Sequence, residues 1–142
     1  MRFHGRSVLR VGYVGPWLIP AILLLTSPAV GESYRNADFI KFSVAGGAAL
    51  IEVSAPWCAP CQLQARALRV ILAQPAFASV RIFNVDYDSQ KEALRRFDAK
   101  LPTTLVLMKA GGEVGRSVGE IRQDRLEWLL RNRMGDAERA WP

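Results

Sequence analysis

With 142 residues, 50% of them hydrophobic and 23% charged, the chain has the size and composition of one small globular domain. Its net charge is +6. Three Arg and no acid lie in residues 1–31, and the rest of the chain has 16 Lys and Arg against 13 Asp and Glu. These charges are scattered, without the basic patch typical of nucleic-acid binding. Two cysteines cannot form a four-cysteine zinc site, and the only histidine is His4, so no metal centre is predicted.

Residues 1–31 are predicted to direct export. A basic start through Arg10 precedes twenty uncharged residues, 11–30, and the small residues Ala29 and Gly31 suit a cleavage site. The alternative is an uncleaved anchor, because the stretch just reaches membrane-spanning length, although its Gly and Pro residues shorten the strongly apolar part. We therefore expect an exported, periplasmic protein, held at the inner membrane if this segment is retained.

The next residues predict a helix followed by a buried strand. Asn36 is a candidate cap for a helix that ends at Gly46-Gly47. The side of the helix expected to be buried carries Phe39, Ile40 and Val44. Residues 48–53 form a nearly continuous apolar run, which is typical of a strand buried on both faces, and its one acid is Glu52.

A helix and a second strand follow the two cysteines. Residues 62–73 predict a helix that ends before Pro75, with its buried side made of Leu63, Ala67, Val70 and Ile71. Residues 80–85 predict a strand, and strands that alternate with helices imply a parallel pair.

The remaining residues predict two helices and a hairpin. Ser89 with Glu92 matches a capping box for a short helix that contains Leu94 and Phe97. Residues 103–108 and 113–118 predict two strands joined by a tight turn at Gly111-Gly112, and the last strand ends at Gly119. A final helix over 124–134 is predicted to line one side with Leu126, Leu129, Leu130 and Arg133. Residues 136–142 are expected to be a loose tail, which leaves 32–135 as the folded domain.

The segment Trp57-Cys58-Ala59-Pro60-Cys61 resembles the active-site motif of the thioredoxin family, Trp-Cys-Gly-Pro-Cys. Leu101-Pro102-Thr103 is similar to the family's aliphatic-Pro-Thr segment, and Glu52 stands where the family usually has Asp. The resemblance spans residues 36–134. It implies an α/β thioredoxin fold, with a central mixed β-sheet flanked by helices.

The cysteines suit disulfide exchange for physical reasons. At a helix N-terminus, Cys58 faces unsatisfied N–H groups and the positive end of the helix dipole, which lower the pKa of its thiol. Cys61, one turn inside, is expected to be the more buried, resolving thiol. Burial should raise the pKa of Glu52 and suit it to act as acid and base for Cys61; the alternative is an edge position facing water.

The resemblance also implies a substrate groove. Pro102 would be a cis-proline opposite the cysteines, leaving the backbone of Leu101 to pair with an extended substrate. From the residues alone, a trans proline at the start of a strand is the safer expectation. The predicted substrate-binding residues are Trp57, Ala59, Pro60, Leu101, Pro102, Val118 and Gly119.

We therefore predict a monomeric thiol-disulfide oxidoreductase that needs no metal or organic cofactor. Reduction of protein disulfides outside the cytoplasm is favoured, because Ala59-Pro60 offers the thiolate no side-chain donor. The electrons would come from a membrane-embedded thiol carrier. The alternatives are a disulfide-introducing oxidase of the same fold, a redox-inert peptide-binding module, and, for the cysteines, a permanent disulfide, for which a two-residue spacer is short.

Overall fold

The computed structural model describes residues 31–134. The predicted leader, residues 1–31, lies outside the described residues except for Gly31, and the predicted tail, residues 136–142, lies wholly outside them. In chain order the elements are β1 (Glu32–Ser33), α1 (Asn36–Val44), β2 (Ala48–Ser54), α2 (Ala59–Leu72), the 3₁₀ helix η1 (Pro75–Phe77), β3 (Val80–Asp86), α3 (Lys91–Arg96), β4 (Thr104–Lys109), β5 (Gly112–Val118) and α4 (Gln123–Met134). Within this part of the chain, no helix has the length and apolarity needed to cross a membrane.

The five strands form one mixed sheet in the order β1-β3-β2-β4-β5. The central strand β2 runs parallel to β3 and antiparallel to β4, and β4 pairs with β5 as a hairpin. The hairpin turns through Ala110 and Gly111, whose φ angles are 49° and 80°, as a turn that matches the twist of two strands requires. The predicted parallel pair and hairpin are both confirmed.

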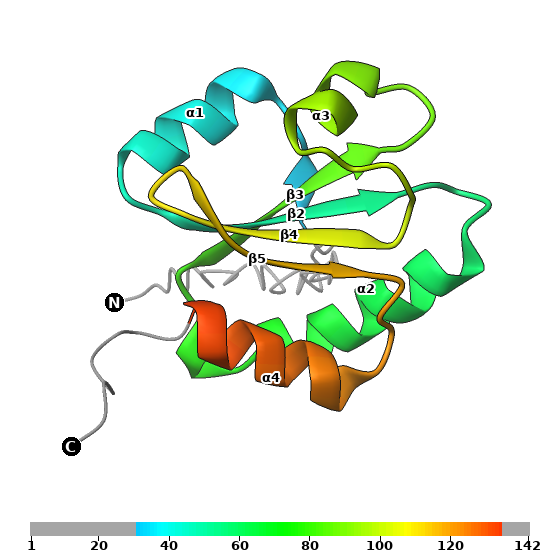
Figure 1. Cartoon of the computed structure of the whole chain (residues 1–142). Coiled ribbons are helices and arrows are strands. Elements are labelled where there is room, and N and C mark those ends of the chain that lie inside the picture. The colour runs from blue at the N-terminus through cyan, green and yellow to red at the C-terminus, as the bar shows by residue number, and fades with distance from the viewer. Residues whose placement is uncertain (1–30, 135–142) are drawn as a thin grey trace, which may run out of the picture.

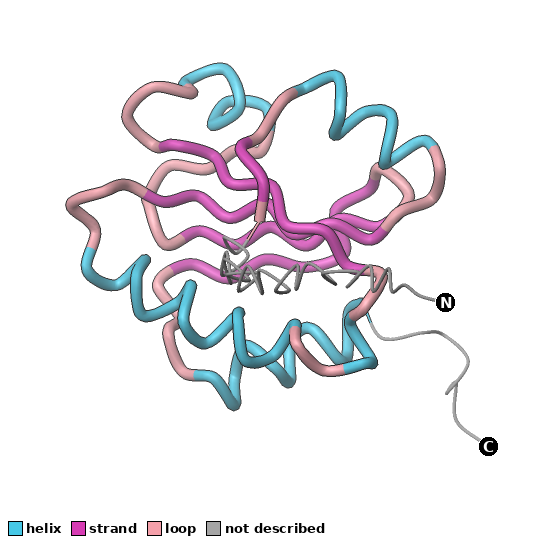
Figure 2. The backbone as a smooth tube through the Cα atoms, turned by 180° about the vertical axis from the view of Figure 1, so that it is seen from behind, coloured by secondary structure: helices cyan, strands magenta, loops and turns pink. Residues whose placement is uncertain are grey.

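Helices cover both faces of the sheet (Figure 1), and the view from behind shows the same three layers (Figure 2). Because successive side chains of a strand point to opposite faces, Ile51 and Val53 of β2 pack in the cluster with α1 and α3. Leu50 and β4's Leu105 belong to the other cluster, with Leu68 of α2 and with α4. The predicted mixed sheet flanked by helices is therefore confirmed.

Two predictions of buried helix faces are wrong. In α1, Phe39 is buried, but Ile40 and Val44 are 41% and 83% exposed. In α2, Ala67 and Ile71 are buried as predicted, whereas Leu63 and Val70 are 45% and 54% exposed. The buried side of α2 is instead formed by Cys61, Gln64, Ala67, Leu68 and Ile71. The polar Gln64 is therefore buried where the prediction placed the apolar Leu63.

The two predicted helix caps are also wrong. The cap position of α1 is Arg35, and Asn36 instead accepts hydrogen bonds from Tyr34 and Arg96 through its side-chain oxygen. Ser89 does not cap α3: its backbone N–H and its hydroxyl both donate to a carboxylate oxygen of Asp86, at 2.7 and 2.6 Å. These bonds lower the pKa of Asp86, and they fold the chain into a turn as it leaves β3.

Candidate active site

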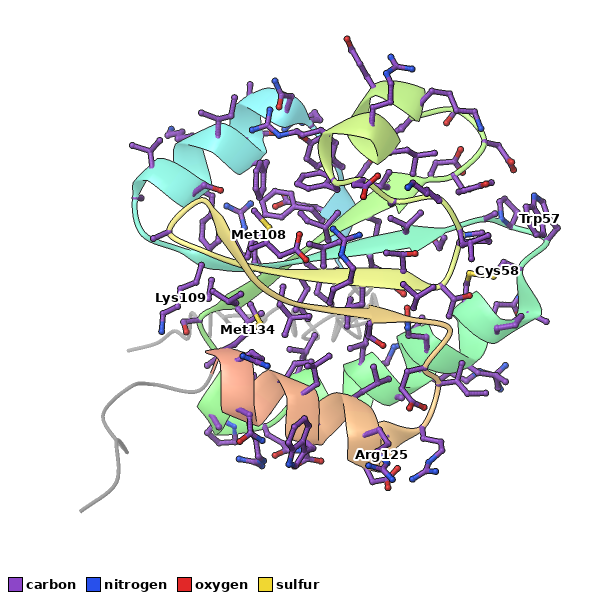
Figure 3. The ribbon with its side chains drawn as sticks, in the orientation of Figure 1. Trp57, Cys58, Met108, Lys109, Arg125 and Met134 are labelled. Carbon is purple, nitrogen blue, oxygen red and sulfur yellow. A yellow bond between two sulfur atoms is a disulfide. The ribbon has the colours of Figure 1, made fainter. Side chains whose placement is uncertain are left out.

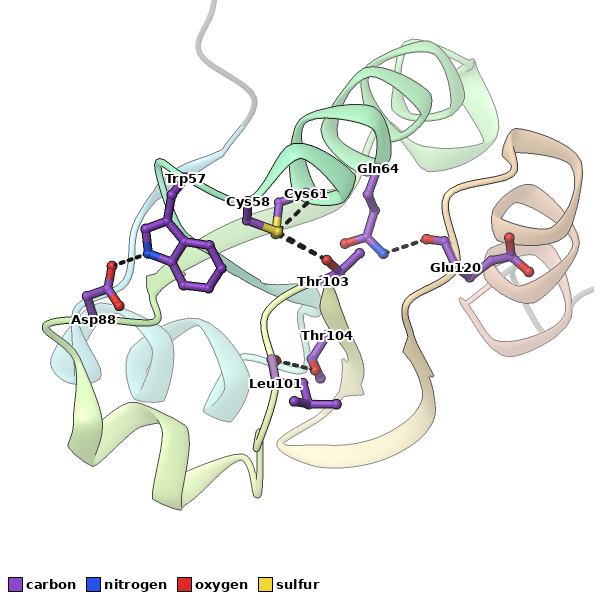
Figure 4. The surroundings of a disulfide bond; sticks show 9 residues. All are labelled: Trp57, Cys58, Cys61, Gln64, Asp88, Leu101, Thr103, Thr104 and Glu120. Carbon is purple, nitrogen blue, oxygen red and sulfur yellow. Dashed lines mark hydrogen bonds between the residues drawn. A yellow bond between two sulfur atoms is a disulfide. The ribbon is translucent and has the colours of Figure 1, made fainter.

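The two cysteines lie at the start of α2, just after the loop that follows β2. Figure 3 places Trp57 and Cys58 at the end of the sheet opposite Lys109 and Met134. Cys58 is the N-cap of α2, and its sulfur accepts a hydrogen bond from the backbone N–H of Cys61 at 3.2 Å. The two sulfurs are joined in a disulfide (Figure 4). The N-cap position gives Cys58 the helix-terminal donors that favour a thiolate.

The expected difference in accessibility between the cysteines does not hold for the disulfide form. Cys58 is 4% exposed and Cys61 is 3% exposed, and both pack with Ala55 and the partly buried Tyr87. The predicted helix start at residue 62 is also late, because α2 begins at Ala59. Position in the helix, rather than exposure, is therefore what distinguishes the two cysteines here.

A residue that the sequence analysis did not assign to the site touches both sulfurs. The hydroxyl oxygen Oγ1 of Thr103 lies 3.3 Å from the sulfur of Cys58 and 3.2 Å from that of Cys61 (Figure 4). The backbone of Thr103 is fixed on two sides, since its N–H donates to Val53 and its carbonyl accepts from Gly119, both at 2.9 Å. The signal in the sequence is its place in Leu101-Pro102-Thr103, the segment that resembles the family's aliphatic-Pro-Thr segment.

The structure thus puts the Thr103 hydroxyl against both sulfurs, and Pro102, which the resemblance predicts opposite the cysteines, is half-buried directly before it. Leu101 is 57% exposed, as a substrate-contacting residue needs to be. Its carbonyl, however, accepts the hydroxyl of Thr104 at 2.6 Å, so part of the backbone expected to pair with substrate already has a partner.

The predicted substrate-binding residues do not line one continuous groove. Leu101 and Val118 line one shallow pocket of about 260 Å³. Trp57 is not part of that pocket: its indole N–H donates to Asp88 at 2.8 Å, and its ring stands edge-on to Tyr87. Gly119 is exposed with φ at +74°, and the spacer residues Ala59 and Pro60 are exposed as well. Trp57, Leu101 and Val118 remain open to solvent and available to an apolar ligand.

Glu52 is buried, which rules out the alternative that it faces water. The residue is 3% exposed, and its neighbours across the sheet are Asn84 on β3 and Leu105 on β4. Burial raises the pKa of Glu52 to about 7. Glu52 and Cys61 line the same cavity of about 540 Å³. A carboxyl that titrates near neutrality in a cavity shared with Cys61 can exchange protons with it through water.

Gln64 is a second buried polar residue near the cysteines that the sequence analysis missed. It lies one turn after Cys61 on the same side of α2, and its amide N–H donates to the carbonyl of Glu120 at 2.8 Å. This bond ties the start of α2 to the segment after β5 (Figure 4). Among residues 31–134, no group of three or more His, Cys, Asp or Glu side chains is placed to hold a metal ion.

Comparisons with known proteins agree with this geometry. The family model described as Thioredoxin matches residues 32–132. The thioredoxin of Chlamydia trachomatis is 37% identical over 88 residues, which cover 62% of this chain and 84% of that protein. The thioredoxin of Chlamydia muridarum is 34% identical over 95 residues, covering 67% of this chain and 91% of that protein.

Solved structures give the same result. The crystal structure of Trxlp from Edwardsiella tarda superposes with a TM-score of 0.66 at 39% identity, covering 68% of this chain and 95% of that one. The thioredoxin of Trypanosoma brucei brucei superposes with a TM-score of 0.64 at 22% identity, covering 78% and 95%, which is a likeness of fold. The fold predicted from the sequence is confirmed.

Proposed function

Since the chain belongs to the thioredoxin family of thiol-disulfide oxidoreductases, we propose that it reduces disulfides of protein substrates outside the cytoplasm, with Cys58 as the attacking thiol and Cys61 as the resolving thiol. The observation that carries the proposal is the N-cap position of Cys58, whose sulfur accepts the N–H of Cys61 at 3.2 Å. Only Cys58 lies at the N-terminus of α2, where the unsatisfied backbone N–H groups of the first turn can stabilise a thiolate.

The exchange takes place in two steps. The Cys58 thiolate attacks one substrate sulfur, so that a mixed disulfide forms and the other substrate sulfur leaves as a thiolate. Cys61 then gives up its proton and attacks the Cys58 sulfur, which releases the second substrate thiol and forms the Cys58–Cys61 disulfide. Two electrons pass from the dithiol to the substrate. Glu52 accepts the Cys61 proton through the cavity that both residues line.

The hydrogen-bond donors around the Cys58 thiolate support reduction, rather than oxidation, of the substrate. Strong oxidants of this type have potentials near −120 mV and thioredoxin near −270 mV, a gap of about 7 kcal/mol. The spacer Ala59-Pro60 contributes no side-chain donor. Thr103 contributes one, which favours the alternative of a disulfide-introducing oxidase, but a hydrogen bond to a charged group contributes only about 1.5–3 kcal/mol. The Thr103 hydrogen bond therefore accounts for less than half of the free-energy difference between the two classes, so a reductant is the better proposal.

The site of action is proposed from residues 1–31, whose basic start and apolar stretch are typical of an export signal or anchor. Compartments outside the cytoplasm are oxidising, so a reductant there needs electrons carried across the membrane. The proposed electron donor is therefore a membrane-embedded thiol carrier, which regenerates the dithiol. The protein is proposed to work as a monomer.

An insulin-reduction assay with dithiothreitol tests the activity. We expect the wild type to accelerate insulin precipitation and Cys58→Ser to leave the rate at that of dithiothreitol alone, while Cys61→Ser accumulates mixed disulfides. Equal traces for the wild type and Cys58→Ser would contradict the proposal. A midpoint against glutathione buffers near that of the strong oxidants would favour the oxidase instead.

A further inference from the structure

A buried hydroxyl reaches the reacting sulfurs from outside the Cys58–Cys61 loop. Thr103 is 4% exposed, and its Oγ1 lies within 3.3 Å of both sulfurs. It lies immediately before β4, 42 residues after Cys61 in the chain, so the tertiary fold brings it there. Neither sulfur of a disulfide carries a proton, so Thr103 must be the donor in these contacts. With a single proton, its hydroxyl can serve only one sulfur at a time.

We propose that in the reduced protein Thr103 donates its hydroxyl proton to the Cys58 thiolate while its oxygen accepts the thiol proton of Cys61. A hydroxyl has one donor and two acceptor lone pairs, so it can bridge the two groups in this sense. The bridge favours the state in which Cys58 is ionised and Cys61 is protonated. The inference rests on the proposed function, in which Cys58 attacks and Cys61 resolves, and it makes Thr103 a catalytic residue of that exchange.

The backbone holds this hydroxyl in place before the substrate arrives. Thr103 has a φ of +58°, a left-handed conformation that β-branched residues rarely adopt. The conformation is held by two hydrogen bonds of 2.9 Å, from the Thr103 N–H to Val53 and from the Gly119 N–H to the Thr103 carbonyl. A donor fixed in advance does not have to be reoriented when charge develops on the sulfur.

Thr104 provides a matched control within the same segment. It is 1% exposed, and its hydroxyl donates to the Leu101 carbonyl at 2.6 Å instead of to a sulfur. Thr103→Val and Thr104→Val therefore each remove one buried hydroxyl with little change of shape, but only the first removes a contact with the cysteines. Thr103→Ser keeps the hydroxyl but loses the methyl group, so it tests whether a change of side-chain shape alone shifts the equilibrium.

The test measures the dithiol-disulfide equilibrium of the full chain with glutathione across pH 6 to 8. Losing a hydrogen bond to a charged group should lower the acid dissociation constant of Cys58 about tenfold or more. Because the Cys58 thiolate becomes more populated as the pH rises, Thr103→Val should favour the disulfide severalfold at pH 8 and much less at pH 6. The other titratable groups around the sulfurs and the adjoining cavity are Cys61 and Arg69 on α2, Glu52 on β2, Asp86 at the end of β3 and Tyr87 after it. They are the same in every variant, and β4 contributes none to this lining.

We expect Thr103→Ser and Thr104→Val to follow the wild type at each pH. An unchanged equilibrium in Thr103→Val, or an equal shift in Thr103→Ser or Thr104→Val, would overturn the inference. Should Thr103→Val fail to fold, Thr103→Ala supplies the same comparison, because it also lacks the hydroxyl. The equilibrium needs no protein substrate, so a failure of the insulin assay and a failure of this inference are separate results.

Discussion

Replacing Glu52 with Gln should change the pH dependence of stability in a direction that the burial of Glu52 determines. Burial raises the pKa of this carboxyl from 4.5 to about 7, so the folded protein holds a proton that the unfolded chain has already lost. The contribution of Glu52 to stability is therefore fully present below pH 4.5 and is lost as the pH rises through about 7. At 1.36 kcal/mol for each pKa unit, the loss amounts to about 3 kcal/mol.

Glu52→Gln has a similar shape and no proton to lose, so it should unfold with nearly the same free energy as the wild type at pH 4.5. At pH 8 the variant should be more stable than the wild type by about 3 kcal/mol. Urea unfolding of both oxidised proteins at several pH values measures the difference. A difference that stays constant between pH 4.5 and 8 would refute the reasoning, and Glu92→Gln, at an exposed position of α3, serves as the surface control.

Two further predictions concern the chemistry of the same residues. Iodoacetamide at mildly acidic pH should modify Cys58 of the reduced protein before Cys61, because Cys58 is the N-cap of α2; faster modification of Cys61 would show that the roles are reversed. In stopped-flow traces, Glu52→Gln should slow the release of the mixed disulfide more than its formation, since Cys61 loses its proton acceptor; unchanged turnover between pH 6 and 8 would leave Glu52 a structural group.

The sequence predicts α1 to α4 and β2 to β5 in the right order, because each of them satisfies a local rule, whereas the short elements β1 and η1 are not predicted. The run 48–53 is apolar except for Glu52, as expected of the central strand of a sheet covered on both faces, and Gly111 supplies a left-handed residue in the turn of the hairpin. The buried side of α2 could not be predicted in this way. Its stripe passes through Gln64, which is buried because its amide reaches the carbonyl of Glu120, a contact between segments 56 residues apart.

The site shows the same division between local and tertiary information. Cys58 and Cys61 are recognisable from their spacing, and Glu52 from its place in an apolar strand. The role of Thr103 depends on register, since its N–H pairs with Val53 and sets the hydroxyl against the sulfurs. A shift of one residue in this pairing would take the hydroxyl away from the sulfurs, and the sequence carries no rule that fixes the pairing.

The register also limits how this protein can recognise a substrate. Pro102 has no N–H to offer, and the carbonyl of Leu101 already accepts the hydroxyl of Thr104. An extended substrate therefore finds fewer backbone partners before Thr103 than strand addition requires. Three large apolar side chains are exposed at the site: Leu101 and Val118 share one shallow pocket with the charged residues Asp98, Lys100 and Arg116, and Trp57 donates its indole N–H to Asp88. Because apolar contacts are non-directional, these side chains should bind hydrophobic surface next to the substrate disulfide without requiring a particular sequence.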